Sequence, residues 1–168
     1  APAAVPLRIG CVTGFGRYRL APRVFREAER TRRIVLRMGS HDQILDWLSA
    51  GVIDLGITYR GVVAAPIESV AVAEETLWLV GAPDGPPTRD NLSRAPCIAY
   101  DEYEYVFGHW FGQVLAAQPP GLAVRDHCNE LEEALIGVRA GRGFTIAPED
   151  AARAFGFVPL SSIAFFAV

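Results

Sequence analysis

The most constraining feature of this sequence is a regular alternation of short apolar runs with helix-compatible stretches between residues 7 and 58. Apolar runs of this length predict strands, and amphipathic stretches predict helices. The expected strands are residues 7–12, 34–36 and 52–58, and the expected helices are residues 17–30 and 41–50. Ser40 stands where the second helix would be capped, and Gly51 where it would end. Strands joined through helices favour parallel pairing with right-handed crossovers, so this half is predicted to be a doubly wound α/β unit.

The alternation is interrupted after residue 58 and returns in the second half. Extended segments are expected at residues 67–73 and 76–81, strands at 97–100, 122–125, 144–146 and 163–168, and helices at 105–117, 131–140 and 148–155. The last strand would return to the first half. We therefore expect an α/β fold of two Rossmann-like subdomains with a cleft and a two-crossing hinge. Subdomain I comprises residues 1–70 and 160–168, subdomain II residues 74–157, and the hinge lies near residues 70–74 and 157–162.

Composition favours a soluble cytoplasmic protein without a metal or a cofactor. No run in the 168 residues approaches the ~20 apolar residues that cross a bilayer. The opening residues have neither the basic start nor the apolar core of a signal peptide. The cysteines and histidines are scattered: Cys11, Cys97 and Cys128, and His41, His109 and His127. Because none has the close spacing of a disulfide framework, a redox pair or a zinc site, we expect reduced thiols and no metal.

The net charge of −3 hides a basic first part of the chain. Nine of the 16 basic residues, all arginine, fall between Arg8 and Arg37, with only Glu27 and Glu29 against them. That stretch carries +7, which leaves −10 for the remainder. Two interpretations stay open: an electrostatic contact with nucleic acid or an acidic protein surface, and an ordinary solvated helix face.

The expected topology also predicts which loops form a ligand site. Ligands of open α/β sheets bind beyond the carboxyl ends of the strands, where helix N-termini present unpaired amides. The loops selected in this way are residues 13–16, 39–41, 58–60, 100–103 and 128–130. Their short polar side chains are those of Thr13, Ser40, Thr58 and Asn129. For Ser40 and Asn129, capping of the following helix is the alternative to ligand contact.

Hydroxyl groups beside helix N-termini suit a small anion such as a carboxylate. Arg60 directly follows Thr58 and Tyr59, and it is the charged side chain that we expect to bind an anionic ligand. The alternative is a surface arginine at the hinge. A further candidate wall is the aromatic stretch of the second half, although aromatic residues at helical spacing are more often core. Its members are Tyr103, Tyr105, Phe107, Trp110 and Phe111.

Several runs in this order resemble one protein family. The opening run Leu7–Gly10 is followed by Phe15–Tyr18 and Leu20–Pro22, and Gly51–Ile57 has the pattern G-x-x-D-L-x-I. Further matching runs are residues 35–37, 39–40, 44–48, 74–80, 82–84, 131–143 and 147–148. Together they resemble, over essentially the whole chain, the C-terminal effector-binding domain of LysR-type transcriptional regulators, which has the type 2 periplasmic-binding-protein fold.

The resemblance implies a non-enzymatic sensor whose effector binds between the two subdomains. The matching positions in the first subdomain are Thr13, Gly14, Ser40, His41, Thr58 and Tyr59. The far wall would consist of Tyr100, Asp101, Asn129 and Thr145. A sensor of this kind regulates transcription because its ligand favours one state of the hinge and of the oligomer.

The resemblance also implies partners. It points to a homodimer through this domain and to a tetramer of the full-length protein. DNA contact is expected only through the family's N-terminal helix-turn-helix. This chain lacks that segment, and it also lacks the family's usual last helix. No membrane partner is expected. Across an antiparallel dimer, the arginine-rich first helix could face Glu130, Glu132 and Glu133. Such exposed pairs are worth only about 0–1 kcal/mol each, so they would set register more than affinity.

Two other classes of protein are alternatives to the sensor. An enzyme would need a nucleophile and a base, but His127 and Cys128 are neighbours that point to opposite faces of an extended segment, and no nucleophile elbow or zinc-protease helix is present. Gly14-Phe15-Gly16 is no dinucleotide loop, because Arg19 occupies the third glycine position. The remaining alternative is an extracytoplasmic solute-binding protein of the same architecture.

Overall fold

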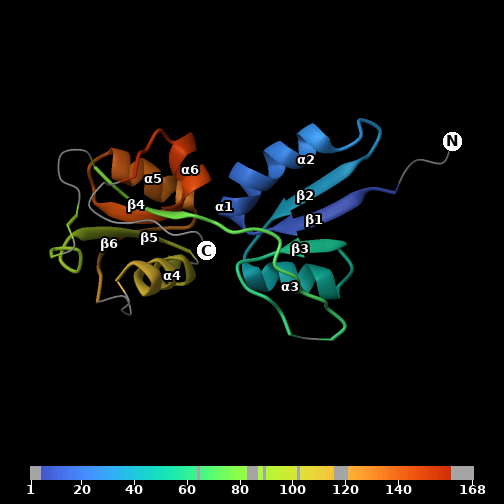
Figure 1. The fold of residues 1–168 in the computed structure, drawn as a ribbon, viewed down its shortest axis with the longest axis horizontal. Coiled ribbons are helices and arrows are strands. Elements are labelled where there is room, and N and C mark those ends of the chain that lie inside the picture. Colours follow the sequence, from blue (N-terminus) through green and yellow to red (C-terminus); the bar gives the residue numbers. More distant parts are fainter. Residues whose placement is uncertain are drawn as a thin grey trace. The chain divides into compact units, whose positions relative to one another are not determined.

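The chain folds into two compact units that divide between Ala73 and Glu74. The computed structural model describes residues 5–63, 65–82, 87–88, 90–101, 103–115 and 121–159, with only the backbone of Leu115. In Figure 1 the first unit runs from blue to green and the second from green to red. Each unit has its own sheet, as expected for a two-subdomain α/β protein.

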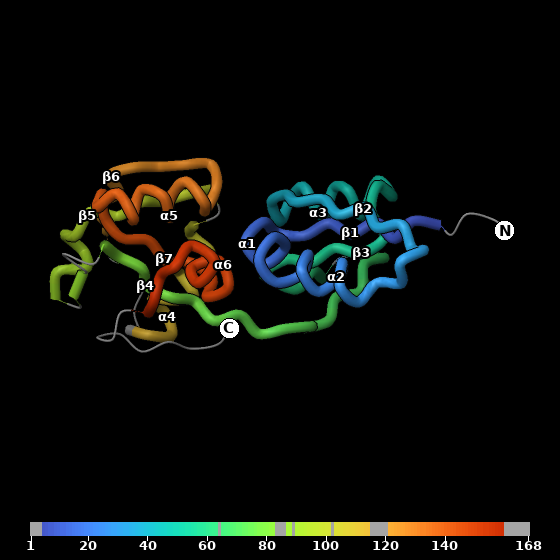
Figure 2. The backbone as a smooth tube through the Cα atoms, turned by 90° about the horizontal axis from the view of Figure 1, so that it is seen from above, coloured from blue at the N-terminus to red at the C-terminus, as the bar shows by residue number. Residues whose placement is uncertain are grey.

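The first unit is a three-stranded parallel sheet with helices on both faces. Its elements are β1 (Leu7–Cys11), α1 (Thr13–Phe15), a π-helical turn (Gly16–Leu20), α2 (Ala21–Glu27), β2 (Ile34–Met38), α3 (His41–Ser49) and β3 (Leu55–Ile57). The strand order is β2-β1-β3, and both pairings are parallel. α2 and α3 lie on opposite sides of the strands in both views (Figure 1, Figure 2). The doubly wound arrangement predicted for this half is confirmed.

The expected first helix is a longer helical stretch, residues 13–27, with a π-helical turn inside it. That turn comes directly before Pro22, which cannot donate an N–H and whose ring crowds the carbonyl four residues earlier. The wider turn is where the helix accommodates the proline. The start of the helix lies close to Met38 of β2. Glycine at position 16 permits this approach, because a Cβ there would collide with the sulfur of Met38.

The core of the first unit lies around the carboxyl end of β1 and α3. Cys11, Val12, Ile44 and Ile53 are buried there. Larger side chains pack around this cluster: Phe15, Leu20, Met38, Trp47, Leu48, Ile57 and Tyr59. The positions expected to face inward on α3 (Ile44, Leu45 and Leu48) are buried or half-buried, so the helical periodicity placed that face correctly.

The second unit is a four-stranded mixed sheet. Its elements are β4 (Leu77–Gly81), β5 (Pro96–Tyr100), α4 (Tyr103–Leu115), β6 (Ala123–Cys128), α5 (Leu131–Arg139), β7 (Phe144–Pro148) and α6 (Glu149–Ala154). The order is β4-β7-β5-β6, in which β5 pairs in parallel with β6 and β7 while β4 is antiparallel to β7. Figure 1 shows α4 and α5 on opposite sides of these strands. Phe107, Trp110 and Phe111 of α4 are buried, so three of the five aromatic residues belong to the core.

Some sequence expectations differ from the structure. The third strand covers only Leu55–Ile57, because Val52 and Ile53 donate hydrogen bonds to the carbonyl oxygen of Trp47 and so wrap around the end of α3. Residues 67–73, expected to be extended, contain only a single bridge residue, Ile67.

Several expectations fall outside the described residues. They concern residues 83–84, residues 116–117 of the expected helix, and residues 160–168, which carry the second hinge crossing and the last strand. The two-crossing hinge therefore stays a prediction.

Candidate functional site

The carboxyl ends of the three strands of the first unit lie level with one another. Cys11 pairs in register with both Met38 and Ile57, the last residues of the neighbouring strands. Two backbone hydrogen bonds continue this alignment into the loops: Gly39 N–H donates to Cys11 O at 3.1 Å, and Val12 N–H donates to Ile57 O at 3.1 Å. The loops that begin after Cys11, Met38 and Ile57 therefore meet at one edge, the position at which parallel sheets bind ligands.

Ser40 is the N-cap of α3. Its Oγ accepts a hydrogen bond from Gln43 N–H at 3.2 Å, and Gln43 Oε1 accepts one from Ser40 N–H at 2.9 Å. This reciprocal arrangement is a capping box. Capping, one of the two roles considered for Ser40, is thus present, and it leaves the hydroxyl proton available for another acceptor.

Arg60 and His41 are in contact beside that helix N-terminus. Arg60 Nε donates to His41 Nε2 at 3.2 Å, and Thr58 Oγ1 donates to the carbonyl oxygen of Arg60 at 2.8 Å. The imidazole nitrogen that faces Arg60 is therefore an acceptor and carries no proton. Arg60 is exposed, and among the described residues its terminal guanidinium nitrogens have no hydrogen-bond partner. The loop after β3 and the start of α3 thus hold the guanidinium of Arg60 at the level strand ends, the edge formed by Cys11, Met38 and Ile57.

The remaining predicted residues of the first unit support this edge. Thr13 is half-buried at the start of α1, and Gly14 beside it is buried. Tyr59 packs against the core cluster around Ile44. The tyrosine ring therefore helps to fix the loop in which Thr58 and Arg60 lie.

Two predicted residues of the second unit have their hydroxyl groups inside the sheet. Tyr100 Oη donates to the carbonyl oxygen of Ile146 at 2.9 Å, and Thr145 Oγ1 donates to that of Ile98 at 2.8 Å. Both residues are buried. These hydroxyls satisfy backbone carbonyls between β5 and β7, so the contacts present are structural ones.

Asp101 is exposed directly after β5. Its N–H is shared between the carbonyl oxygens of Cys128 (3.2 Å) and Asn129 (3.3 Å). Its carboxylate lies 2.8 Å from the ring of His127, Oδ1 to Nε2. Sequence reasoning considered His127 only as a partner of Cys128 and did not place it in the site. The available signal was the alignment of two parallel strands, which sets the residue after β5 beside the end of β6.

Asn129 does not cap α5. The N-cap is Glu130, whose side chain accepts from the N–H of Glu133 while Glu133 Oε2 accepts from Glu130 N–H at 2.8 Å. The proposed capping role of Asn129 is therefore wrong. Its exposed side chain has no hydrogen-bond partner in the part of the chain that the structure describes.

The pKa values of two of the three cysteine thiols are raised. Burial raises the pKa of Cys97 to about 12. Burial also raises the pKa of Cys128, with smaller contributions from the negative charges of Glu133 and Asp126. A reactive cysteine needs a lowered pKa, so neither thiol is a nucleophile at neutral pH.

Within the described ranges, no three metal-ligating side chains are grouped to hold an ion. No described helix combines the length and the apolar character needed to cross a bilayer.

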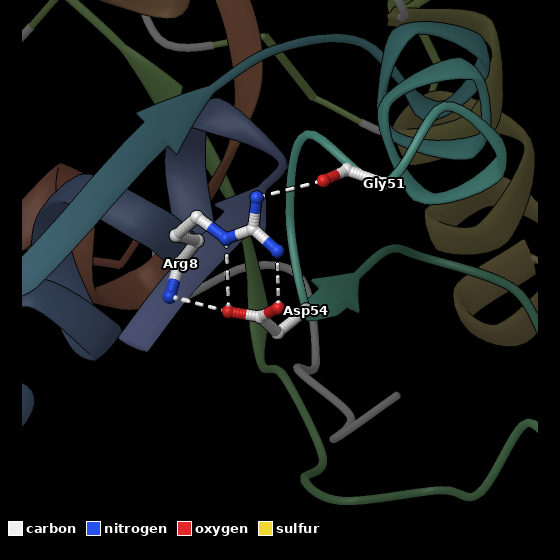
Figure 3. A network of polar contacts seen from close by, with 3 residues as sticks. All are labelled: Arg8, Gly51 and Asp54. Carbon is white, nitrogen blue, oxygen red and sulfur yellow. Dashed lines mark hydrogen bonds and ion pairs between the residues drawn. The ribbon is translucent and has the colours of Figure 1, made fainter. Parts of the chain in front are cut away.

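A bidentate ion pair of the first unit lies at the other end of β1, away from the carboxyl ends of the strands. Figure 3 shows Arg8, the second residue of β1, between Asp54 and the carbonyl oxygen of Gly51. Its Nε and Nη2 donate to Asp54 Oδ2 and Oδ1 at 3.1 and 2.6 Å, and its N–H donates to Oδ2 at 3.0 Å. The side-chain hydrogen bond from Arg8 is the main reason why the pKa of Asp54 is lowered. This network ties β1 to the turn before β3.

Comparison with known proteins gives one family and one fold. Residues 3–158 match the family model described as the LysR substrate binding domain. No curated protein sequence matches the chain.

Three solved structures illustrate the fold. The bromide-bound regulatory domain of HypT from Salmonella typhimurium has a TM-score of 0.70 and 17% identity, covering 96% of this chain and 82% of that one. The effector-binding domain of QuiR in complex with shikimate has a TM-score of 0.69 and 16% identity, covering 96% and 79%. CbnR, a LysR family transcriptional regulator, has a TM-score of 0.68 and 20% identity, covering 97% and 58%. The chain thus spans little more than half of the CbnR chain.

Proposed function

This chain belongs to the LysR substrate-binding domain family, and we propose that it is the effector-sensing part of a transcription regulator and that its effector is a small anion. The observation that carries the proposal is the Arg60 guanidinium, held by His41 at the level strand ends of the first unit. DNA binding by the full-length regulator, through a domain outside this chain, is part of the same proposal, as is its place in the cytoplasm.

The electrostatics of this edge favour an anion. A guanidinium with uncommitted terminal N–H groups binds carboxylates and phosphates through two parallel hydrogen bonds. The N-terminus of α3 adds the positive end of a helix dipole. HypT is described with bromide and QuiR with shikimate, which carries a carboxylate, so two proteins of this fold take up anions.

Regulation requires the ligand to distinguish two states of the protein. A ligand shifts an equilibrium only by its differential affinity for those states. We expect the effector to contact groups of both units, with Asp101 and Asn129 as the accessible members of the set predicted in the second. A ligand that contacted one unit alone would bind without changing the hinge.

Binding of small anions to purified protein tests the proposal. A thermal-shift screen of small carboxylates and inorganic anions identifies ligands, because a ligand at 100 times its Kd adds about 2.7 kcal/mol to the stability of the native state. For the best ligand, titration calorimetry of Arg60→Gln should show an affinity reduced by about tenfold or more, as expected for loss of a charge-assisted hydrogen bond.

Arg94→Gln is the matched control, since Arg94 is an exposed arginine of the second unit. It should bind like the wild type. If no anion stabilises the wild-type protein, or if Arg60→Gln binds as tightly as Arg94→Gln, the anion assignment is wrong.

Dimerisation through this domain is the second part of the proposal. Large apolar side chains are exposed on α2, β6 and α5: Phe25 (64%), Val124 (45%) and Ile136 (57%). β6 is an edge strand, and natural proteins cover or protect such edges. A second copy of the chain would cover these side chains. Glu130 and Glu133 cap α5 within the chain, so ion pairs of these residues with arginines of a partner would come in addition to that role.

A further inference from the structure

At the strand ends of the second unit, we infer that His127, held by Asp101, selects effectors that carry a hydroxyl group. This inference rests on the proposed function and deepens it. It assigns the effector to the class of hydroxylated carboxylates, with the imidazole of His127 as the acceptor for the hydroxyl group.

The imidazole is fixed by two neighbouring strands. Ala99 of β5 pairs in register with His127 of β6, and Tyr100 with Cys128. Asp101 follows Tyr100, and its N–H donates to the carbonyl oxygens of Cys128 and Asn129. Backbone hydrogen bonds therefore set the position from which Asp101 Oδ1 reaches His127 Nε2 at 2.8 Å.

Tyr103, at the start of α4, completes this setting. Its ring meets the imidazole edge to face at 6.0 Å between centroids, and it meets Phe107 in the same way at 5.2 Å. Phe107 is buried in the core of the unit. The imidazole is thus bounded by a carboxylate on one edge and by an aromatic ring that is itself packed against the core.

This arrangement determines what His127 offers to a ligand. A carboxylate oxygen accepts, so the ring nitrogen that faces Asp101 carries the proton. In the neutral imidazole, the other nitrogen, Nδ1, is then an acceptor. Within the described part of the chain, Nδ1 has no hydrogen-bond partner, and the side chain of His127 is 50% exposed. A fixed, accessible acceptor is suited to a hydroxyl group of a ligand.

The charge of Asp101 disfavours an anionic group beside this imidazole and favours a neutral donor. The carboxylate of Asp101 lies 2.8 Å from His127. A second carboxylate placed there would be repelled, whereas a hydroxyl group can donate its proton to Nδ1. A site that hydrogen-bonds a hydroxyl also rejects the analogue without it, because a polar group then loses its partner.

Matched pairs of carboxylates with and without hydroxyl groups test the inference. Titration calorimetry at pH 8 compares lactate with propionate, 3-hydroxybutyrate with butyrate, and shikimate with cyclohexene-1-carboxylate. We expect the wild-type protein to prefer the hydroxylated member of at least one pair by about fivefold or more, the effect of one hydrogen bond to a fixed acceptor. In His127→Phe, which keeps an aromatic ring and removes the acceptor, this preference should fall below about twofold.

Two further variants separate a ligand contact from a structural effect. His127→Gln retains an acceptor oxygen and should restore part of the preference. His109→Phe replaces a histidine that stacks on Tyr105 further along α4, and it should keep the whole preference.

The outcomes separate this inference from the proposed function. If both members of every pair bind equally to the wild type, or if His127→Phe retains the preference, the hydroxyl assignment is overturned while anion binding stands. If neither these titrations nor the thermal-shift screen finds an anion that binds at about 10 mM, where a ligand with a Kd near 1 mM is nearly saturating, anion binding fails and the hydroxyl assignment fails with it.

Discussion

At the scale of single residues, the ion pair between Arg8 and Asp54 joins two parts of the first unit that the sequence separates widely. Four hydrogen bonds connect the two residues, one of them from Asp54 N–H to the carbonyl oxygen of Arg8, and a fifth connects Arg8 to the carbonyl oxygen of Gly51. Their side chains are 39% and 40% exposed, so solvent screens the pair. Bidentate geometry nevertheless makes it stronger than an ordinary surface ion pair.

We predict that Arg8→Gln lowers the Tm at pH 7 and that the difference from the wild type shrinks in acid. The pKa of Asp54 is below its ordinary value of 3.8 because of the Arg8 hydrogen bond. A carboxylate with a lowered native pKa contributes stability above its unfolded pKa, and this contribution is lost as the pH falls through the native pKa. Thermal unfolding between pH 7 and pH 3 measures the effect, which should decline from about pH 4 downward.

Arg26→Gln is the control for this prediction. Arg26 pairs with its neighbour Glu27, and both side chains are 68% exposed. Removing such a pair should leave the Tm nearly unchanged. An Arg8→Gln deficit as large at pH 3 as at pH 7 would show that the charge of Asp54 is not its source.

At the scale of elements, the alternation of strands and helices was sufficient to predict the fold. Seven of the eight extended segments expected on described residues form strands, the exception being residues 67–73, and the five expected helices occur with them in the predicted order. Their ends follow from local signals, because Gly51 and Gly141 follow the ends of α3 and α5 with positive φ. The antiparallel direction of β4 was not predictable, since its partner β7 lies more than 60 residues later in the sequence.

The site was predictable only at the level of loops. The rule on strand ends selected the loops around Thr13, Ser40 and Thr58, which do meet at one edge. Which side chains remain accessible depends on hydrogen bonds that form after folding. Thr145 is turned into the sheet by the carbonyl oxygen of Ile98, and His127 gains its importance from Asp101, 26 residues away. Neither contact leaves a signal in the local sequence.

Gly143 is the glycine on which the junction between β5 and β7 most depends. It precedes β7 with φ of +156°, and a Cβ there would collide with the backbone carbonyl of Pro96, the first residue of β5. We predict that Gly143→Ala destabilises the protein by about 1–3 kcal/mol, the usual cost of forcing extra volume into a packed site. Urea unfolding measures the change.

Gly108→Ala is the opposite case in the same unit. Gly108 lies within α4, and a Cβ there would meet no atom within 4 Å. Alanine should therefore stabilise the helix by about 0.5–1 kcal/mol. If Gly143→Ala leaves the urea midpoint unchanged or raises it as Gly108→Ala does, close approach of Gly143 to Pro96 is not what selects glycine.

At the scale of the whole molecule, the two units offer different chemistry to a ligand. The first presents the guanidinium of Arg60, and the second presents Asp101 and His127. The guanidinium favours an anionic group, and the imidazole beside a carboxylate favours a hydroxyl group. The free energy available for regulation is the difference in the affinity of one ligand for two states of the protein, because only contacts that differ between states shift an equilibrium.

Association of two copies leads to a prediction about Ile136. This residue is 57% exposed on α5, while Leu131, Ala134, Leu135 and Val138 of the same helix are buried in the unit. Ile136→Glu should therefore leave the fold intact. If α5 lies in the dimer interface, a charge buried there without a partner costs several kcal/mol, enough to weaken dimerisation by about a hundredfold or more. Sedimentation equilibrium of the variant measures this change in dimerisation, with circular dichroism to verify the fold.

Val158→Glu is the control, at a residue that is 73% exposed beyond the end of α6, and it should dimerise like the wild type. Equal dimerisation of Ile136→Glu and the wild type would place the interface elsewhere.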